Sequence, residues 1–243
     1  MPTPRRSLSF SVAFIACLTL ALPTLGAQTA ETFEAKVNGK DAKLGYLLYL
    51  PKGYESKKDA KAPLLLFLHG SGERGDNIEV VKKHRPPMLV EEGKDLPFIV
   101  VSPQCPKNER WDADVLKALI EEVMKNHRVD ADRVYCTGLS MGGFGTWALC
   151  SKPPAMFAAA VPICGGGNPQ AVKAMKGIPT WVFHGDKDNA VKLEASQVMA
   201  DARKAAGGAV KFTIYEGVGH DSWVKAYNTD ELYKWLLSHK RGK

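Results

Sequence analysis

The segment VYCTGLSMGGFGTW at residues 134–147 joins an apolar strand pattern to a glycine-rich helix start. Its centre, GLSMG, places Ser140 between Gly138 and Gly142 in the G-x-S-x-G pattern of a nucleophile elbow. Such an elbow holds a serine on a strained turn between a strand and a helix, and small residues on both sides let the two backbones approach closely. The segment therefore predicts that Ser140 is a nucleophile at the carboxyl end of a strand.

Two later segments supply candidate partners for Ser140. The strand pattern at 178–184 ends in an acidic turn that contains Asp186 and Asp188, and the pattern at 210–215 leads into a glycine-rich loop that contains His220. In a Ser-His-Asp triad the imidazole takes the serine proton, and the carboxylate orients the imidazole and stabilises its charged form. We predict His220 as the base and Asp188 as the acid, with Asp186 as the alternative acid. This chemistry requires no cofactor.

A stabilising site for a tetrahedral oxyanion is expected beside the elbow. The apolar run 64–68 predicts a strand buried on both faces, and it ends in the loop HGSGERG at 69–75. We assign the donors to the backbone amides of Ser71 and Met141, the latter being the residue after the nucleophile. Glu73 and Arg74 are predicted to brace this loop as a pair.

Strand and helix patterns alternate along the chain. They predict strands near 32–37, 43–50, 64–69, 97–102, 132–138, 157–163, 178–184 and 210–215, and helices at 111–127, 193–206 and 229–238 as well as after the elbow. Right-handed crossovers between such elements give a mostly parallel α/β sheet with the site at the carboxyl ends of its strands. The first two strands, joined by Asn38-Gly39, are predicted to form an antiparallel hairpin at the edge.

Six segments together carry a family resemblance. They are LHGSGERGDN at 68–77, VVSPQCP at 100–106, VYCTGLSMGGFGTW at 134–147, AAAVPICGGG at 158–167, HGDKDNAV at 184–191 and GHDSWVKAYN at 219–228. The chain resembles single-domain α/β-hydrolases of the secreted carboxylesterase type, close to feruloyl-esterase-like and polyhydroxybutyrate-depolymerase-like proteins of bacteria. The resemblance implies an α/β-hydrolase fold with an eight-stranded sheet flanked by helices. It also places the acid at the last aspartate of a His-Gly-x-x-Asp pattern, which is Asp188.

The amino-terminal residues read as an export signal. Arg5 and Arg6 precede an apolar run from Phe10 to Leu22, and the small residues before position 28 suit cleavage near Ala27. We therefore expect a signal peptide at 1–27, one catalytic domain at 28–243, and a secreted or periplasmic protein. No later stretch approaches the ~20 apolar residues of a membrane span.

The charge and the cysteine content of the chain indicate neither a nucleic-acid partner nor a metal site. Loss of Arg5 and Arg6 lowers the formal charge from +7 to about +5, and the remaining charge is spread without a basic block, so no nucleic-acid partner is expected. Four cysteines remain, namely Cys105, Cys136, Cys150 and Cys164; the even count permits two disulfides, but nothing requires them. Their spacings do not resemble a zinc site, so no metal is expected. The oligomeric state is left open.

The substrate cleft is expected to be open. Few residues separate Gly165 from Ile178, where relatives of this fold insert a lid, so we predict no large lid domain. Gln104, Trp111 and Trp223 lie near the carboxyl ends of strands and are candidate substrate-binding residues, although Trp111 also suits simple packing at a helix start. Three further histidines, His84, His127 and His239, are predicted to be surface residues.

These observations predict an exported serine carboxylic-ester hydrolase that forms an acyl-enzyme. Small esters and esters carried on polysaccharide are the expected substrates, with feruloyl or other hydroxycinnamoyl esters of plant polysaccharide among them. Three alternatives share the sequence features: a serine peptidase of the prolyl-oligopeptidase type, an acyltransferase, and a catalytically silent binding protein. We expect no large extra domain of the kind that restricts access in such peptidases, which disfavours the peptidase.

Overall fold

The computed structural model describes residues 27–152 and 156–242. The expected signal peptide at 1–27 lies outside these residues except for Ala27. Within the described part of the chain, no helix has the length and hydropathy needed to cross a membrane.

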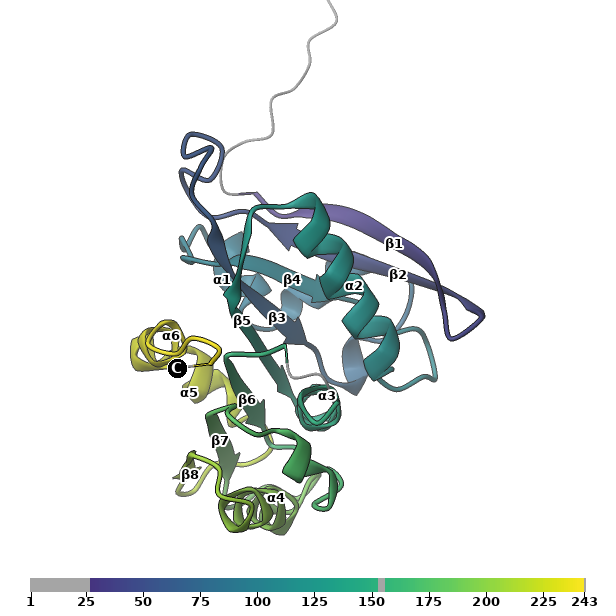
Figure 1. The fold of residues 1–243 in the computed structure, drawn as a ribbon. Coiled ribbons are helices and arrows are strands. Elements are labelled where there is room, and N and C mark those ends of the chain that lie inside the picture. Colours follow the sequence, from purple (N-terminus) through teal and green to yellow (C-terminus); the bar gives the residue numbers. More distant parts are fainter. Residues whose placement is uncertain (1–26, 153–155, 243) are drawn as a thin grey trace, which may run out of the picture.

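A single sheet of eight strands forms the centre of the molecule (Figure 1). The strands are β1 (Thr29–Val37), β2 (Lys40–Tyr49), β3 (Ala62–Leu68), β4 (Ile99–Pro103), β5 (Val129–Leu139), β6 (Ala159–Ile163), β7 (Thr180–Gly185) and β8 (Val210–Tyr215). Their order is β1-β2-β4-β3-β5-β6-β7-β8; β2 pairs antiparallel with β1 and β4, and all other pairs are parallel. The prediction of a mostly parallel eight-stranded sheet is thus confirmed.

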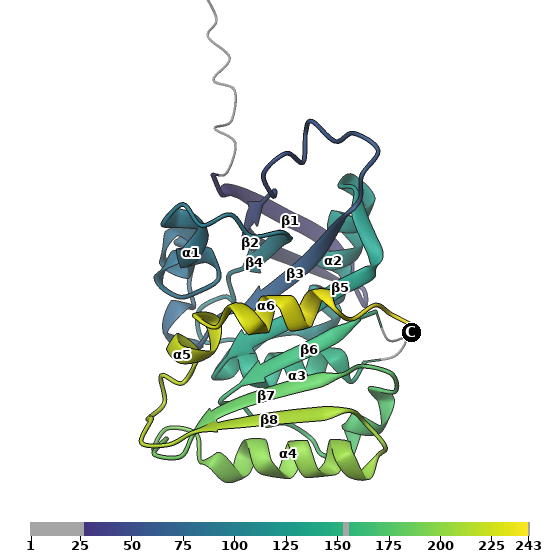
Figure 2. The same cartoon turned by 90° about the vertical axis from the view of Figure 1, so that its left-hand side faces the viewer.

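Helices connect the strands and cover both faces of the sheet (Figures 1 and 2). The α-helices are α1 (Pro87–Glu91), α2 (Ala113–Asn126), α3 (Met141–Cys150), α4 (Leu193–Ala205), α5 (Trp223–Tyr227) and α6 (Asp230–Leu237). Three 3₁₀ turns join them, η1 (Ser71–Glu73), η2 (Ile78–Lys83) and η3 (Ala171–Ala174). Of these elements, α1, α5 and the 3₁₀ turns were not expected, because each is too short to show a periodic apolar pattern.

Alternating side chains of the central strands divide the core into two layers. Leu64, Leu66 and Leu68 of β3 pack with the apolar stripe of α2, whereas Leu65 and Phe67 belong to the layer that contains α6. Figure 2 shows α6 lying across one face of the sheet, with α3 behind it. Since successive residues of a strand face opposite sides, a strand buried on both faces is apolar throughout. This explains the continuous apolar run at 64–68.

The predicted hairpin at the sheet edge is present. β1 and β2 pair along their length, and Asn38 and Gly39 at the turn have φ values of 51° and 80°. Positive φ at both turn residues matches the twist of the two strands and suits an Asn-Gly pair. Between β6 and β7 the chain contains only a loop and η3, so this connection holds no lid domain.

Candidate active site

Ser140 lies on a strained turn between β5 and α3. Its φ and ψ are 52° and −117°, and its amide donates to the carbonyl oxygen of Ile163 on the neighbouring strand at 3.0 Å. A Cβ on Gly142 would overlap the carbonyl oxygen of Leu68, and a Cβ on Gly138 would overlap that of Gly142. The two glycines of the motif are therefore required for strand and helix to approach, which is what the sequence pattern predicts.

A hydrogen-bonded chain connects Ser140 to His220 and Asp188. Nε2 of His220 lies 2.9 Å from Oγ of Ser140, and Nδ1 of His220 lies 2.7 Å from Oδ2 of Asp188. Asp186 has a different place: its Oδ1 accepts from the amide of Gly217 at 2.7 Å and closes the turn. Of the two candidate acids, the fold therefore brings Asp188 to the imidazole.

The surroundings of Asp188 favour its ionised form. Its Oδ1 accepts from the amides of Ala190 and Val191, each at 2.9 Å. Burial tends to raise the pKa of this carboxyl, but the hydrogen bond from His220 and the bonds from the two amides outweigh burial and lower the pKa overall. Asp188 is thus a buried carboxylate that remains available to orient and stabilise the imidazole.

His184 lies on the opposite side of the same carboxylate. This fully buried side chain places Nε2 at 3.1 Å from Oδ2 of Asp188 and at 2.9 Å from the carbonyl oxygen of Val191. Its Nδ1 lies 2.7 Å from Oγ of Ser196, which in turn donates to the carbonyl oxygen of Gly165 at 2.9 Å. In the sequence, His184 is simply the last residue of the strand pattern before the acidic turn.

Cys164 is a buried residue that lies close to Asp188 and His220. Its Sγ, a carboxylate oxygen of Asp188 and a ring nitrogen of His220 lie within 4.8 Å of one another. Burial raises the pKa of the Cys164 thiol to about 12, so this sulfur is protonated at neutral pH. The other two groups of this cluster are joined to each other by the hydrogen bond between His220 and Asp188. Cys105, Cys136, Cys150 and Cys164 are all buried free thiols.

A small pocket of about 250 Å³ opens beside Ser140. It is lined by Ser71, Arg74, Arg110, Ser140, Met141 and Phe144. The two residues whose amides were expected to bind an oxyanion, Ser71 and Met141, therefore flank the same space as Ser140. Met141 is the first residue of α3 and Ser71 the first of η1, and amides at such positions have no partner within their own helix.

The loop that carries Ser71 is held by buried side chains. Gln104 donates to the carbonyl oxygens of Glu73 at 2.8 Å and Asn77 at 2.9 Å. His69 at the start of the loop accepts from the amide of Cys105 at 3.0 Å through Nε2 and donates through Nδ1 to Gly70 at 2.6 Å. We expected Gln104 to contact substrate; instead its amide is buried and occupied by the loop backbone, so it positions the loop at 69–75, which we call the oxyanion loop after the role predicted for Ser71.

Glu73 and Arg74 brace the loop separately, not as the pair that we expected. Glu73 lies 3.3 Å from Nε2 of His84, which was expected at the surface and has a side chain that is only 21% exposed. Burial tends to raise the pKa of Glu73, but the hydrogen bond and charge of His84 outweigh it and lower the pKa overall. Arg74 donates instead to the carbonyl oxygens of Ser71 at 3.0 Å and Glu109 at 3.1 Å.

The two candidate tryptophans occupy different places. Trp223 packs edge-on against His220, with ring centroids 5.1 Å apart, and against His84 at 5.5 Å. Trp111 donates from its indole nitrogen to the carbonyl oxygen of His69 at 3.2 Å and packs against α3 at Gly145. Trp111 is not one of the described residues that line the pocket beside Ser140. The helix-start packing that the sequence also allowed is present.

Comparison with known proteins identifies the family of this chain. The model of the dienelactone hydrolase family matches residues 32–231. An endo-1,4-beta-xylanase/feruloyl esterase of Xylanibacter ruminicola is 31% identical over 72% of this chain and 26% of its own, and a bifunctional acetylxylan esterase/xylanase of Neocallimastix patriciarum is 30% identical over 55% of this chain and 20% of its own. The crystal structure of a thermostable esterase superposes with a TM-score of 0.77 at 33% identity, covering 89% of this chain and 64% of that one.

This chain spans about a quarter or less of the length of these two curated relatives, so the likeness concerns one part of each. The family match, in contrast, covers most of the chain and includes the elbow, the acidic turn and the histidine loop. Together with the eight-stranded sheet, it confirms the expected α/β-hydrolase fold. The chain belongs to the dienelactone hydrolase family.

Proposed function

We propose that this protein is a serine hydrolase of carboxylic esters. The observation that carries the proposal is the chain from Asp188 through His220 to Ser140, with contacts of 2.7 and 2.9 Å, ending at a serine on a strained elbow. Relatives and a solved structure whose names include the word esterase support ester hydrolysis. In this proposal Ser140 is the nucleophile, His220 the general base and acid, and Asp188 the residue that orients it.

The reaction follows from these positions. Oγ of Ser140 attacks the ester carbonyl carbon while its proton passes to Nε2 of His220, and the amides of Ser71 and Met141 bind the oxyanion. The bond to the alcohol then breaks, and His220 returns the proton to the leaving oxygen. Water attacks the resulting acyl-enzyme, gives a proton to His220, and releases the acid as Ser140 recovers its proton. No cofactor takes part in this scheme.

The substrates that we propose are esters borne by a polymer or by a small alcohol. The pocket at Ser140 is small, and the connection between β6 and β7 holds no lid domain. An ester group that projects from a larger molecule can therefore approach Ser140. Feruloyl esters and acetyl esters of plant polysaccharide are the first candidates, because two relatives are named as a feruloyl esterase and an acetylxylan esterase. Export through the signal peptide at 1–27 would bring the enzyme to such substrates.

The test is hydrolysis by the purified mature chain and its Ser140→Ala variant. The panel contains short and long acyl nitrophenyl esters, methyl ferulate, acetylated xylan and a peptide amide. We expect turnover of esters that disappears in the variant, and no comparable turnover of the amide. Faster cleavage of the amide than of any ester would favour the peptidase alternative, and binding of esters without turnover by the unmodified chain would favour a binding protein.

A further inference from the structure

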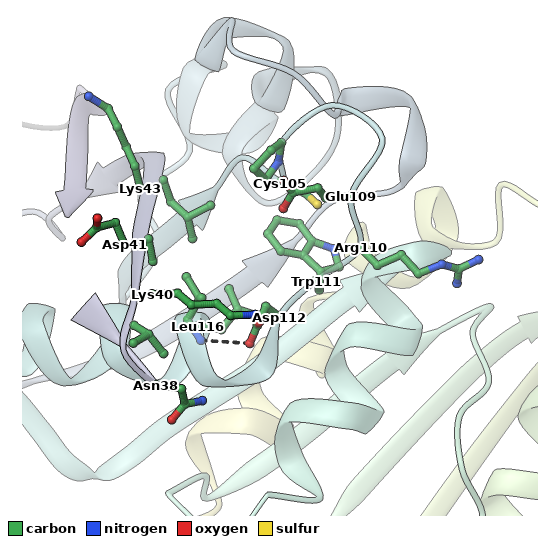
Figure 3. A pocket seen from close by; sticks show the side chains of 15 residues that line it. Asn38, Lys40, Asp41, Lys43, Cys105, Glu109, Arg110, Trp111, Asp112 and Leu116 are labelled. Carbon is green, nitrogen blue, oxygen red and sulfur yellow. Dashed lines mark hydrogen bonds between the residues drawn. The ribbon is translucent and has the colours of Figure 1, made fainter. Parts of the chain in front are cut away.

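A second and larger cavity, of about 530 Å³, lies beside the β1–β2 hairpin (Figure 3). Its walls come from three places: the hairpin, the loop between β4 and α2, and the first turns of α2. Its lining residues are Val37, Asn38, Lys40, Asp41, Ala42, Lys43, Leu44, Cys105, Pro106, Glu109, Arg110, Trp111, Asp112, Val115 and Leu116. Cavities of this size commonly bind small molecules or segments of larger ones. None of the groups proposed for ester hydrolysis lies in it.

The walls of this cavity are fixed to one another. Nδ2 of Asn38 at the hairpin tip donates to Oδ2 of Asp114 on α2 at 3.1 Å. Asp112 caps the same helix by accepting from the amide of Asp114 at 2.8 Å. Trp111 is tied to the oxyanion loop through its bond to the carbonyl oxygen of His69. The cavity is therefore preformed, which reduces the entropy lost when a ligand binds.

The lining suits an uncharged ligand rich in hydroxyl groups. Trp111, which Figure 3 shows at the centre of the wall, supplies an apolar indole surface, and Leu44 and Leu116 add buried apolar atoms. Around them stand three cationic side chains, Lys40, Lys43 and Arg110, and three anionic ones, Asp41, Glu109 and Asp112. The charges balance, so neither an anion nor a cation is selected. A sugar offers apolar C–H faces to the indole and hydroxyls to both kinds of charged group.

The cavity and the pocket at Ser140 share one lining residue. Arg110 lines both spaces, and in Figure 3 it extends away from Trp111 and the hairpin. The loop that carries it is tied to the oxyanion loop, because Arg74 donates to the carbonyl oxygen of Glu109 at 3.1 Å. For a chain in the larger cavity to present an attached ester to Ser140, the chain would have to pass Arg110.

We propose that this cavity is a subsite for a neutral sugar chain that carries the scissile ester. The inference rests on the proposed ester hydrolysis and extends it, because it assigns the alcohol part of the substrate to a defined place on the molecule. The cavity gives affinity for the polymer, whereas the chemistry at Ser140 needs only the ester group. Small esters without the sugar chain bypass the subsite.

A blocking variant tests this assignment. Ala42 lines the cavity from β2 and is half-buried, so Ala42→Trp places an indole in the space. We expect the ratio of kcat/KM for a feruloylated xylo-oligosaccharide to that for methyl ferulate to fall about tenfold, chiefly through KM. Val198→Trp, at an exposed position on α4 far from the hairpin, is the matched control and should leave the ratio unchanged.

A binding measurement separates this inference from the proposed reaction. Unesterified xylotetraose is titrated by calorimetry into the Ser140→Ala protein, and oligogalacturonate is used as the charged probe. Binding of xylotetraose that Lys40→Ala and Ala42→Trp both weaken supports the subsite even if no ester is cleaved. Equal or tighter binding of oligogalacturonate, or an unchanged substrate ratio in a folded Ala42→Trp protein, would overturn it, whereas lack of ester cleavage alone would contradict only the proposed function.

Discussion

Nε2 of His184 lies 3.1 Å from Oδ2 of Asp188, the same carboxylate oxygen that lies 2.7 Å from Nδ1 of His220. Because Nε2 of His184 also faces the carbonyl oxygen of Val191 at 2.9 Å, this nitrogen must carry a proton and act as a donor. Asp188 is therefore held by the amides of Ala190 and Val191 at one oxygen and by His220 at the other, and His184 lies against that second oxygen while it donates to the carbonyl oxygen of Val191. This arrangement fixes the carboxylate before a substrate arrives.

Removal of the His184 donor should slow turnover. We expect His184→Met, which retains volume without a donor, to lower kcat about 10- to 100-fold and to leave KM nearly unchanged, since buried partners of an oriented group commonly contribute this much. His184→Gln keeps a donor nitrogen and should recover a large part of kcat. Steady-state kinetics on a nitrophenyl ester, normalised by titration of active serines with an organophosphorus ester, provide the measurement. An equal kcat per active serine in the Met variant would show that His184 only supports folding.

Ser71 should act through its backbone amide. Gly70 before it is extended, with φ −78° and ψ −175°, and Ser71 starts η1, so both positions tolerate a proline at 71. We expect Ser71→Pro to lower kcat about 100- to 1,000-fold, because the oxyanion loses one donor, while Ser71→Ala stays within about threefold of the original rate. Comparable losses in both variants would instead assign the effect to the hydroxyl.

The closeness of β3 and α3 predicts a sharp contrast between two glycines. A Cβ on Gly142 would overlap the carbonyl oxygen of Leu68, whereas a Cβ on Gly72 meets no atom within 4 Å. We expect Gly142→Ala to lower the free energy of unfolding by about 3 kcal/mol or to prevent folding, and Gly72→Ala to change it by less than about 0.5 kcal/mol. Urea unfolding followed by circular dichroism measures both. Similar stability of the two variants would argue against the tight elbow.

Glu73 should make part of the stability depend on pH. Its pKa in the folded protein is lowered from 4.5, so its contribution is present above that value and is lost as the pH falls through the lower folded pKa. We expect Glu73→Gln to be less stable by about 1–3 kcal/mol at pH 7 and to lose less stability than the unmodified protein on acidification from pH 5 to pH 3. Thermal unfolding across this range gives the comparison; parallel pH curves for the two proteins would contradict it.

Local patterns were sufficient for most of the fold. The strand predicted at 210–215 is β8 with the same bounds, and the helix predicted at 111–127 appears as α2 with ends one or two residues inside. The buried strand at 64–68 and the turn at Asn38-Gly39 could be predicted from adjacent residues alone. Side-chain alternation in a strand and the conformation of a turn are determined over a few residues. The glycines around Ser140 likewise identify the elbow without reference to distant residues.

Contacts between distant segments required the tertiary structure. Gln104 looked like a substrate contact and braces the oxyanion loop; His84 looked exposed and pairs with Glu73. No local pattern distinguishes these outcomes, because the direction and partner of a loop side chain depend on which other loops pack against it. Folding also brings segments that are far apart in the sequence together around the sheet. Only then does Asp188 lie between His184 and His220, and only then does the cavity form between the hairpin and α2.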